Sequence, residues 1–264
     1  MNVLVTVIIP AHNEAETVAK VVEVARNDAD EVLVVDSCSS DNTRILAAEA
    51  GAKVIHVDTI GKHRALQIGI AAARGEELVF LDADLREPNP DIVKALLGGL
   101  RRADDIVLSK GYYGSSSSQS NEGGRLTELC ARPLMTLLYP HLSSIRQPLG
   151  GEYALRRDIA LHVPLAPGYA VDLGILLHCA AIGTVAQVDL GTKRHKHRPL
   201  LDLGKAAVEI AAVLLNSAGW HFSKTVLSQF PGGGVMDTPI DLESLEPLVS
   251  LNDKTLPQPL GELP

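Results

Sequence analysis

The chain contains few aromatic residues, few cysteines and no long apolar run. Aromatic residues make up 3% of its 264 residues, so the core is expected to consist mainly of Val, Leu, Ile and Ala. Three scattered cysteines, Cys38, Cys130 and Cys179, form no CxxC pair, and this odd, low count predicts reduced thiols in the cytoplasm. No signal-peptide pattern is present, and no apolar stretch approaches the roughly 20 residues of a membrane-spanning helix. We therefore expect a cytoplasmic protein without a membrane partner.

Sequence motifs of several enzyme classes are also missing. The chain has no G-x-S-x-G, no Walker Gly-Lys-Ser/Thr and no G-x-G-x-x-G, which argues against hydrolases, P-loop enzymes and Rossmann dehydrogenases. A net charge of −8 argues against nucleic-acid binding, because a positive surface is needed to replace the counterions of nucleic acid. With 46% hydrophobic and 21% charged residues, the composition is that of a globular protein with a substantial core.

The first hundred residues alternate between strand and helix patterns. Four short apolar segments are separated by segments whose apolar residues have helical spacing. This alternation predicts parallel strands joined by right-handed crossovers. The predicted strands are 3–9, 31–35, 53–57 and 77–81, and the predicted helices are 14–27, 41–50 and 62–74. The fold class is therefore α/β, and ligands are expected beyond the carboxyl ends of the strands.

The second half of the chain is less regular. Helices are expected at 125–139, 172–182 and 203–215, strands near 147–155 and 185–190, and a mobile Ser/Gly loop at 111–124. Residues 219–264 are rich in Gly, Pro and acidic residues, so we expect an irregular or partly disordered extension. One domain followed by this extension is the simplest division.

Two carboxylates one residue apart, Asp82 and Asp84, follow the strand expected at 77–81. Hard cations prefer oxygen ligands, and Mg²⁺ typically combines one or two carboxylates with substrate phosphates. The pair therefore predicts a metal that carries a diphosphate, with Asp84 as the better ligand and Asp82 on the metal or a ribose. Two acids in a surface turn are the alternative.

Polar segments also follow the first two predicted strands. Residues 10–14 are placed to frame a nucleobase or ribose, although Asn13 and Glu14 could simply begin a helix. In residues 36–43, Ser37 is the favoured base contact, while Asp41 with Thr43 also suits an ordinary turn and cap.

Two further segments carry cationic side chains or hydrogen-bond donors that could bind an anion. Lys62 stands near the positive end of a predicted helix dipole, which favours a bound diphosphate over a solvated lysine. A backbone turn, a guanidinium and a hydroxyl occur together at Gly124, Arg125 and Thr127. This combination suits the binding of a small anion. The alternative is that the segment simply starts a helix.

The six residues 193–198 are all Lys, Arg or His, although the chain is acidic. A solvated basic loop is one interpretation of this run. The other is that His195, arriving from the distant half of the chain, completes the metal shell begun by Asp84, while the remaining cations face phosphates.

Taken together, residues 7–14, 36–43 and 81–84 resemble those of GT-A glycosyltransferases. Four more specific segments, 123–129, 147–153, 166–169 and 195–200, are similar to the glucosyl-3-phosphoglycerate synthase family. The resemblance spans about residues 3–215. It implies a Rossmann-like, mostly parallel sheet flanked by helices, with a catalytic domain over 1–218 (nucleotide-sugar half 1–110, acceptor half 111–218) and an extension over 219–264.

The resemblance implies a retaining, Mg²⁺- or Mn²⁺-dependent transfer of glucose from UDP-glucose to the 2-hydroxyl of 3-phosphoglycerate, with a homodimer as the expected assembly. Asp84 and His195 would hold the metal, and both, with Lys62 and Asp172, would be catalytic. The donor would be bound by Pro10, Ala11, Glu14, Ser37, Lys62, Asp82, Ala83, Gly150, Gly151, Tyr169, Asp172 and Lys193. The acceptor would be bound by Gly124, Arg125, Thr127 and His197. Asp172, Lys193 and His197 stand where the family has Glu, Arg and Asn.

Three other functions are compatible with parts of this pattern. Related enzymes transfer mannose from GDP-mannose to the same acceptor, so the donor is the least secure element. A nucleotidyltransferase would need a Gly-rich N-terminal loop, which is absent. A catalytically inactive UDP-sugar sensor is disfavoured by the presence of Asp82, Asp84 and His195.

Overall fold

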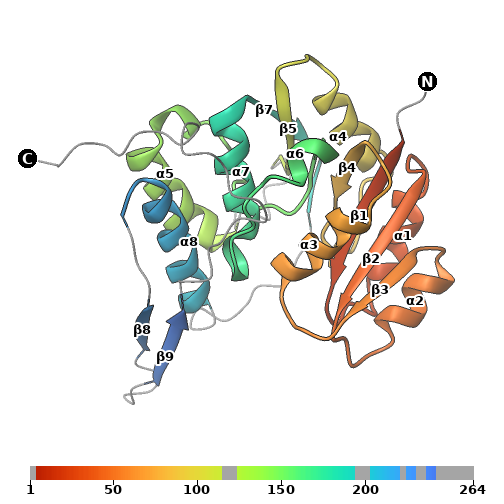
Figure 1. Ribbon diagram of the computed structural model, residues 1–264, viewed down its shortest axis with the longest axis horizontal. Helices are drawn as coiled ribbons and strands as arrows, with labels where there is room; N and C mark the ends of the chain where they lie inside the picture. The colour runs from red at the N-terminus through yellow and green to blue at the C-terminus, as the bar shows by residue number, and fades with distance from the viewer. Residues whose placement is uncertain (1–3, 115–123, 194–202, 221–223, 230–235, 242–264) are drawn as a thin grey trace, which may run out of the picture.

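Helices cover both faces of a seven-stranded sheet in the computed structural model, which describes residues 4–114, 124–193, 203–220, 224–229 and 236–241 (Figure 1). In the view of Figure 1, strands β1–β3 lie on the right and helices α5 and α8 on the left, with α7 between them. This arrangement confirms the α/β class expected from the alternating pattern.

The large sheet has the strand order β3-β2-β1-β4-β6-β5-β7. Strand β6 runs antiparallel to both of its neighbours, and the other pairings in this sheet are parallel. The strands are β1 (Val5–Ala11), β2 (Glu31–Ser37), β3 (Lys53–Val57), β4 (Glu77–Phe80), β5 (Ile106–Tyr112), β6 (Tyr153–Arg156) and β7 (Thr184–Asp189). The four strands predicted in the first hundred residues are confirmed, with ends that differ by a few residues.

The helices connect the strands and form the outer layers. They are α1 (Val18–Ala25), α2 (Thr43–Glu49), α3 (Lys62–Ala72), α4 (Ile92–Leu100), α5 (Arg132–Leu138), α6 (Arg157–Ala160), α7 (Val171–Ile182) and α8 (Gly204–Ser217). Shorter turns are the π-helical η1 (Thr127–Ala131) and the 3₁₀ segments η2 (Pro140–Leu142) and η3 (Gly168–Ala170). Among the described residues, no helix has the length and apolar character needed to cross a membrane.

Side chains of β1 enter two separate cores because successive residues of a strand point to opposite faces. Ile8 packs with residues of α3 and α7 on one face, whereas Val7 and Ile9 pack with α1 and α4 on the other. All three are fully buried. This burial on both faces explains why the strand is a continuous apolar run without polar alternation.

The antiparallel direction of β6 decides which loops meet at the carboxyl edge of the sheet. Strands β1, β2, β4, β5 and β7 all end at this edge, and β6 begins there. Gly151, which precedes β6, therefore lies beside Asp82, which follows β4. The sequence pattern indicated a strand near 147–155 but did not indicate this direction.

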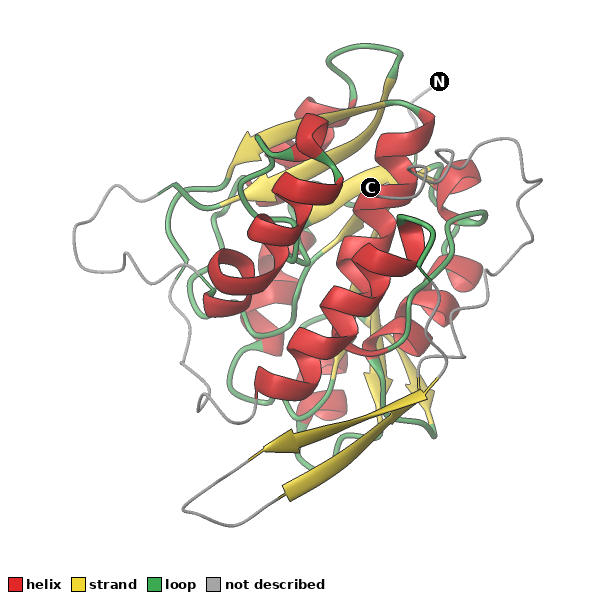
Figure 2. Ribbon diagram, turned by 90° about the vertical axis from the view of Figure 1, so that its left-hand side faces the viewer, coloured by secondary structure: helices red, strands yellow, loops and turns green. Residues whose placement is uncertain are grey.

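Three features of the structure differ in detail from the expected pattern, while the division into domains stays a prediction. The loop expected at 111–124 begins later, because β5 continues to Tyr112. The division at residue 110 falls inside β5, so the two expected halves share one sheet. The extension expected to be irregular contains an antiparallel hairpin of β8 (Lys224–Gln229) and β9 (Met236–Asp241), separate from the large sheet (Figure 2).

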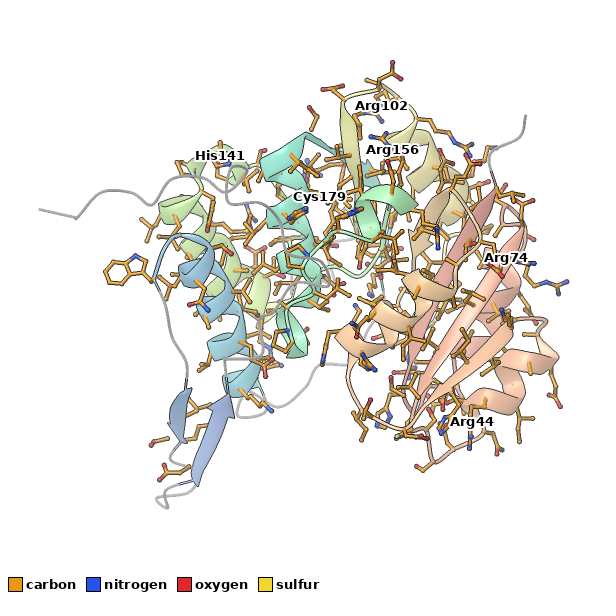
Figure 3. All side chains as sticks on the ribbon, viewed as in Figure 1. Arg44, Arg74, Arg102, His141, Arg156 and Cys179 are labelled. Atoms are coloured by element: carbon orange, nitrogen blue, oxygen red, sulfur yellow. The ribbon has the colours of Figure 1, made fainter. Side chains whose placement is uncertain are left out.

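The three cysteines are free, as the sequence predicted. Cys179 lies on α7 and is fully buried in the core between this helix and the sheet (Figure 3). Burial raises the pKa of the Cys179 thiol to about 12, so it is a packing residue with little thiolate character.

Two adjacent glycines of α4 provide a test of how closely this helix packs on the sheet. A methyl group at Gly99 would overlap Ser109 Oγ on β5 and lie 2.5 Å from Val188 Cγ2 on β7, whereas nothing lies within 4 Å of one at Gly98. Gly99→Ala should lower the free energy of unfolding by about 1–3 kcal/mol. Gly98→Ala should raise it by up to about 1 kcal/mol, because Ala has the higher helix propensity. Urea unfolding of the two variants measures the contrast, and equal effects would contradict the packing.

Candidate functional site

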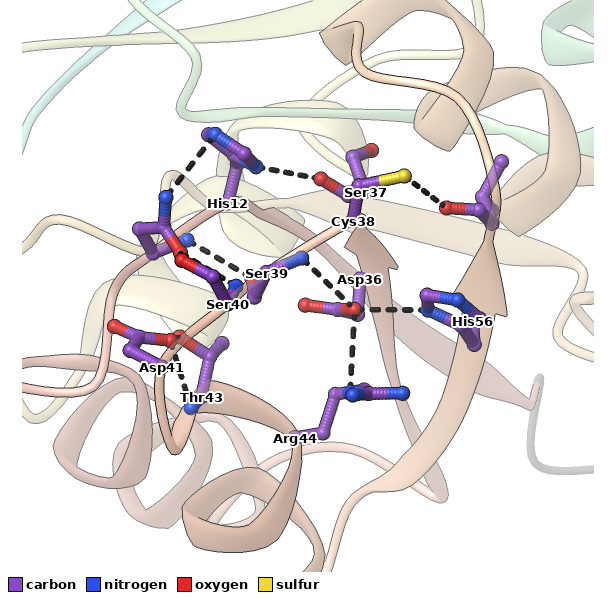
Figure 4. A network of polar contacts seen from close by, with 12 residues as sticks. His12, Asp36, Ser37, Cys38, Ser39, Ser40, Asp41, Thr43, Arg44 and His56 are labelled. Carbon is purple, nitrogen blue, oxygen red and sulfur yellow. Dashed lines mark hydrogen bonds and ion pairs between the residues drawn. The ribbon is translucent and has the colours of Figure 1, made fainter.

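The loops that follow β1 and β2 are joined by hydrogen bonds between their polar residues (Figure 4). The Asn13 amide donates to Ser39 Oγ at 2.9 Å, and the Ser40 amide donates to Asn13 Oδ1 at 2.9 Å. His12 Nδ1 lies within hydrogen-bond distance of the Ser37 carbonyl. The two polar strand ends predicted to form one site are thus in direct contact.

Helix α1 begins at Val18, four residues after the predicted start. Asn13 has a left-handed backbone with φ of 57°, and the Glu14 amide donates to Thr43 Oγ1 at 2.8 Å, so this segment belongs to the loop. The alternative that Asn13 caps the helix is therefore wrong. The turn expected at Asp41 is confirmed, because Asp41 Oδ1 accepts the Thr43 amide at 3.0 Å, but the residue at the N-cap position of α2 is Asn42.

Ser37, the favoured base contact, ends β2 and is 3% exposed. Its hydroxyl has no hydrogen-bond partner among the described residues, although its neighbours are densely bonded. Pro10 and Ala11 end the adjacent strand β1. A buried hydroxyl without a partner is costly unless a ligand or water satisfies it, which supports the prediction for Ser37.

Five charged side chains form a continuous chain at the carboxyl edge of the sheet. Lys62 Nζ lies 2.6 Å from Asp172 Oδ2 and 2.7 Å from Asp82 Oδ1. Lys193 Nζ lies 3.6 Å from Asp82 Oδ2 and 2.8 Å from Glu152 Oε1. The order is Asp172, Lys62, Asp82, Lys193, Glu152, with Asp82 held between two lysines.

Proximity of opposite charges decides the ionisation of the three central groups. Burial alone would raise the pKa of Asp82, but Lys62 and Lys193 outweigh it and hold that pKa far below its usual range. Burial would lower the pKa of both lysines, and their carboxylate partners raise it instead. All three groups are therefore charged at neutral pH.

The two outer acids behave differently because they are the most deeply buried. Burial raises the pKa of Asp172, and contact with Lys62 offsets only part of this effect. Burial likewise raises the pKa of Glu152 against the opposing charge of Lys193. These side chains anchor the two lysines from the side of the core.

Lys62 is placed as predicted, at the first position of α3, but its partners modify the original reasoning. The positive charge at this helix start was expected to require a bound diphosphate. Asp82 and Asp172 already supply anions there, so the helix position by itself does not demand a ligand. The diphosphate contact of Lys62 stays a prediction.

Gly151 has no space for a side chain, because a methyl group there would overlap Asp82 Oδ1 and lie 2.6 Å from Lys62 Nζ. The backbone between β5 and β6 therefore lies directly against the ion-pair chain. Gly150 accepts a hydrogen bond at its carbonyl from Lys110 Nζ. Of the two glycines expected beside the donor sugar, Gly151 adjoins Asp82 and Gly150 adjoins Lys110 and Glu152.

Lys110 is a buried cation that the sequence analysis missed. It lies in β5, is 1% exposed, and pairs in register with Tyr153 of β6, which pairs with Phe80 of β4. Its Nζ lies 4.8 Å from the centroid of the Tyr153 ring, and that ring stacks on Phe80 with centroids 4.7 Å apart. A lysine within the apolar run that forms β5 was the available signal.

The residues present suit a divalent cation. Asp82 Oδ2 and Asp84 Oδ1 lie 3.6 Å and 3.9 Å from the same ammonium, Lys193 Nζ, so two carboxylate oxygens converge on one position of positive charge. Asp84 is 53% exposed at its side chain and accessible from solution. Ala83 between the two acids is buried. The described residues contain no group of three metal-ligating side chains, and the second expected ligand, His195, lies outside them.

Glu14 faces the same pair of acids from the loop after β1. Burial, together with the charges of Asp84 and Asp82, raises the pKa of Glu14. A carboxyl close to two other acids is harder to ionise, and a cation bound among the three would stabilise its ionised form. Its prediction as a donor-site residue is consistent with this position.

Tyr169 lies in η3, just before Asp172, and is 43% exposed. Its amide donates to Glu209 Oε2 of α8 at 2.8 Å, and the φ of 69° at Gly168 is a conformation that favours glycine. Segment η3 also contacts α3, which carries Lys62. Glu209 is thus a second residue missed from the sequence, and it fixes the turn that leads into Asp172.

The expected acceptor residues Gly124, Arg125 and Thr127 stand at the start of η1. Thr127 is buried, and the Gly124 carbonyl accepts the Glu128 amide at 3.1 Å. Helix α8 packs against both η1 and η3, and so connects this segment to the one that carries Tyr169. His197, the fourth expected acceptor residue, lies outside the described residues.

Comparison with known proteins places these features in a family. The family model of glycosyl transferase family 2 matches residues 6–158. A glucosyl-3-phosphoglycerate synthase of Mycolicibacterium smegmatis is 39% identical over 274 residues, which cover 95% of this chain and 90% of the relative. That coverage is wider than residues 3–215, the span of the resemblance seen in the sequence.

Solved structures of glucosyl-3-phosphoglycerate synthase from Mycobacterium tuberculosis share the fold. One, in complex with Mg²⁺ and UDP, has a TM-score of 0.84 at 36% identity and covers 93% of this chain and 90% of that chain. Another, in complex with Mn²⁺, UDP-glucose and phosphoglyceric acid, has a TM-score of 0.83 at 36% identity, covering 93% and 89%.

Lys110 predicts a distinctive dependence of stability on pH. Burial, together with the positive charge of Lys62, lowers the pKa of Lys110 to about 8 from the usual 10.5. The negative charges of Asp172, Glu152 and Asp82 oppose this shift but do not cancel it. Between these values the unfolded chain binds more protons than the native one, so raising the pH stabilises the native state. The free energy of unfolding of wild type relative to Lys110→Met should rise from pH 8 to 10, by at most about 1.4 kcal/mol per unit.

Urea unfolding at several pH values measures this difference. Lys94→Met, which removes an exposed lysine of α4, is the matched control for the loss of one positive charge. A Lys110→Met difference that stays constant across this pH range would show that the ammonium is not desolvated as described.

Proposed function

This chain belongs to glycosyl transferase family 2, and from that premise we propose that it transfers glucose from UDP-glucose to the 2-hydroxyl of 3-phosphoglycerate. The observation that carries the proposal is the meeting of Asp82 and Asp84 with two lysines at the carboxyl edge of the sheet. Support comes from the relative of Mycolicibacterium smegmatis, which bears that activity in its name and matches nearly the whole chain.

The donor diphosphate would lie against Lys62 and Lys193, which the protein holds charged on both sides of Asp82. Asp84, together with His195, would hold Mg²⁺ or Mn²⁺, which when bound supplies Lewis-acid neutralisation of the leaving diphosphate. The two lysines stabilise the same developing charge without reorganisation, because their carboxylate partners already fix them. Asp82 and Ala83 would border the ribose.

The uridine would occupy the joined loops after β1 and β2. The Ser37 hydroxyl has no partner among the described residues and would bond the base, with Pro10, Ala11 and Glu14 around the nucleoside. The hydrogen bonds between the two loops fix this surface before the ligand arrives, which reduces the ordering cost of binding.

The glucose would lie between Gly150, Gly151, Tyr169 and Asp172. Asp172 is fixed by Lys62 and is therefore suited to position sugar hydroxyls, with the catalytic effect of orientation. We infer a retaining transfer, in which the acceptor hydroxyl approaches the anomeric carbon on the face that the leaving phosphate occupied.

The acceptor would be bound by Gly124, Arg125, Thr127 and His197. A guanidinium, a hydroxyl and backbone amides at a helix start together suit the phosphate and carboxylate of 3-phosphoglycerate. The homodimer and the cytoplasmic location expected from the sequence stay predictions.

A panel of donors and acceptors tests the function. UDP-glucose, GDP-mannose and ADP-glucose are each incubated with and without 3-phosphoglycerate, and with and without EDTA, and product is detected by mass spectrometry. We expect a glucosyl product only with UDP-glucose and 3-phosphoglycerate, and its loss with EDTA. A mannosyl product in preference to the glucosyl one would favour the GDP-mannose alternative, and donor binding without transfer would indicate a sensor.

Asp84→Ala tests the proposed metal ligand. We expect transfer to fall by roughly a hundred-fold or more, because a bound divalent ion contributes several kcal/mol of charge stabilisation. Binding of Mn²⁺, followed by its paramagnetic resonance signal, should weaken in parallel. Asp91→Ala, at an exposed acid just before α4, is the control and should retain both properties. Undiminished transfer by the Asp84 variant would remove this residue from the metal site.

A further inference from the structure

We propose that Glu152 is the positioning residue that holds Lys193 against Asp82, and that it thereby sets the affinity of the site for a nucleoside diphosphate. This role deepens the proposed function and rests on it, because Lys193 is placed on the donor side of the site. Glu152 stands between Gly151 and the start of β6, and no role was predicted for it from the sequence.

Glu152 is held in place by its backbone and by the burial of its side chain. Its side chain is 1% exposed, and its Oε1 accepts from Lys193 Nζ at 2.8 Å. Its carbonyl accepts the amide of Gly111 at 2.8 Å, which ties it to β5. Lys193, in contrast, lies in the segment that follows β7, and its ammonium is at the end of a flexible four-carbon side chain. Of the two partners, the carboxylate is the fixed point and the ammonium is the group that is oriented.

The environment of Lys193 shows what the carboxylate supplies. The other groups near its Nζ are more distant: Asp82 Oδ2 at 3.6 Å, Asp84 Oδ1 at 3.9 Å, and the centroid of the Tyr113 ring at 5.5 Å. Only the contact with Glu152 has the length of a direct charge-assisted hydrogen bond among these four. Without it, the lysine would retain attraction toward the acids but lose its defined position.

Lys62 shows the same construction on the other side of Asp82. Its Nζ is shared between Asp82 and a buried acid of the second half of the chain, Asp172. Lys193 is likewise shared between Asp82 and the buried Glu152. Each lysine thus has one partner toward the site and one anchor toward the core.

A contribution to stability alone does not account for this anchor. Desolvation of a buried ion pair cancels most of its Coulombic gain, so such a pair adds little to the net free energy of folding. What the pair of Glu152 and Lys193 provides is orientation, because the flexible Lys193 ammonium is held in one place before the ligand binds. Pre-organisation of this kind increases affinity by lowering the cost of ordering.

A double-mutant cycle tests the inference. The affinity for UDP in the presence of Mn²⁺ is measured by calorimetry for wild type, Glu152→Gln, Lys193→Met and the double variant. Gln keeps the size of the side chain and removes its charge. We expect Glu152→Gln to weaken UDP binding roughly 10-fold, as loss of a supporting partner does at ligand sites. The double variant should bind no more weakly than Lys193→Met alone.

Two results of the cycle would overturn the proposal. One is an unchanged UDP affinity in Glu152→Gln. The other is an equal loss caused by Glu152→Gln in the wild-type and Lys193→Met backgrounds, which would show that Glu152 does not act through the lysine. Glu152→Asp, which keeps the charge but shortens its reach, provides a second variant and should cause a smaller loss of the same kind.

A direct measurement of lysine position accompanies the cycle. The rate at which an amine-acylating reagent modifies Lys193 is followed by mass spectrometry, with the exposed Lys53 as internal reference. The rate should increase in Glu152→Gln and Glu152→Asp because the ammonium is released from its anchor. An unchanged rate in folded variants would contradict the positioning role even if binding changed.

Glu31→Gln is the matched control for losing a buried carboxylate. Glu31 starts β2, is buried, and bonds Arg74 Nε at 2.9 Å and Thr6 Oγ1 at 2.9 Å. Because Glu31 is the first residue of β2, it lies at the edge of the sheet opposite to the carboxyl edge that carries the site; Figure 3 labels its partner Arg74. It should change thermal stability without changing UDP affinity or the acylation of Lys193.

The outcomes separate this inference from the proposed function. Absence of glucosyl transfer by the wild type would refute the function, while the UDP cycle, which needs no acceptor, would still be informative. If the wild type failed to bind UDP with Mn²⁺, the acylation rates would still decide whether Glu152 positions Lys193.

Discussion

The candidate site depends on the Asp82 carboxylate, which lies between two ammonium groups. Each of its oxygens faces one lysine, Lys62 at 2.7 Å and Lys193 at 3.6 Å, and each lysine is anchored by a buried acid, Asp172 or Glu152. The lysine charges keep Asp82 ionised despite its burial, and the acids keep the lysines in place. A charged ligand therefore meets cations that are already oriented, which is the basis of electrostatic pre-organisation.

This chain of charges also connects distant parts of the polypeptide. Lys62 and Asp82 come from the first half, whereas Glu152, Asp172 and Lys193 come from the second. The antiparallel strand β6 makes the meeting possible, because its start lies at the edge where β4 ends. A parallel strand in that place would have carried Gly151 and Glu152 to the opposite edge. The direction of one strand thus determines the composition of the site.

Prediction from the sequence succeeded where a local pattern carries the information and failed where a distant partner does. The apolar runs predicted β1 to β4, and the placement of Asp82 and Asp84 after a strand predicted an acid pair at the carboxyl edge. The start of helix α1 was misjudged, because Ser39 on the loop after β2 and Thr43 at the start of α2 bind the amides that would have begun it. Lys110 and Glu152 were missed, because their importance arises from burial beside Asp82 and not from their neighbours in sequence.

The sequence by itself determined the α/β class, the polar ends of the strands and, through resemblance, the family. These properties follow from periodicity and short motifs, which a chain carries whether or not it is folded. Only the tertiary structure decided that Asp82 bridges two lysines, that Lys62 already has anionic partners, and that the tail contains a hairpin. Ion pairing, burial and strand direction depend on which residues meet in space, and that meeting is produced by folding of the whole chain.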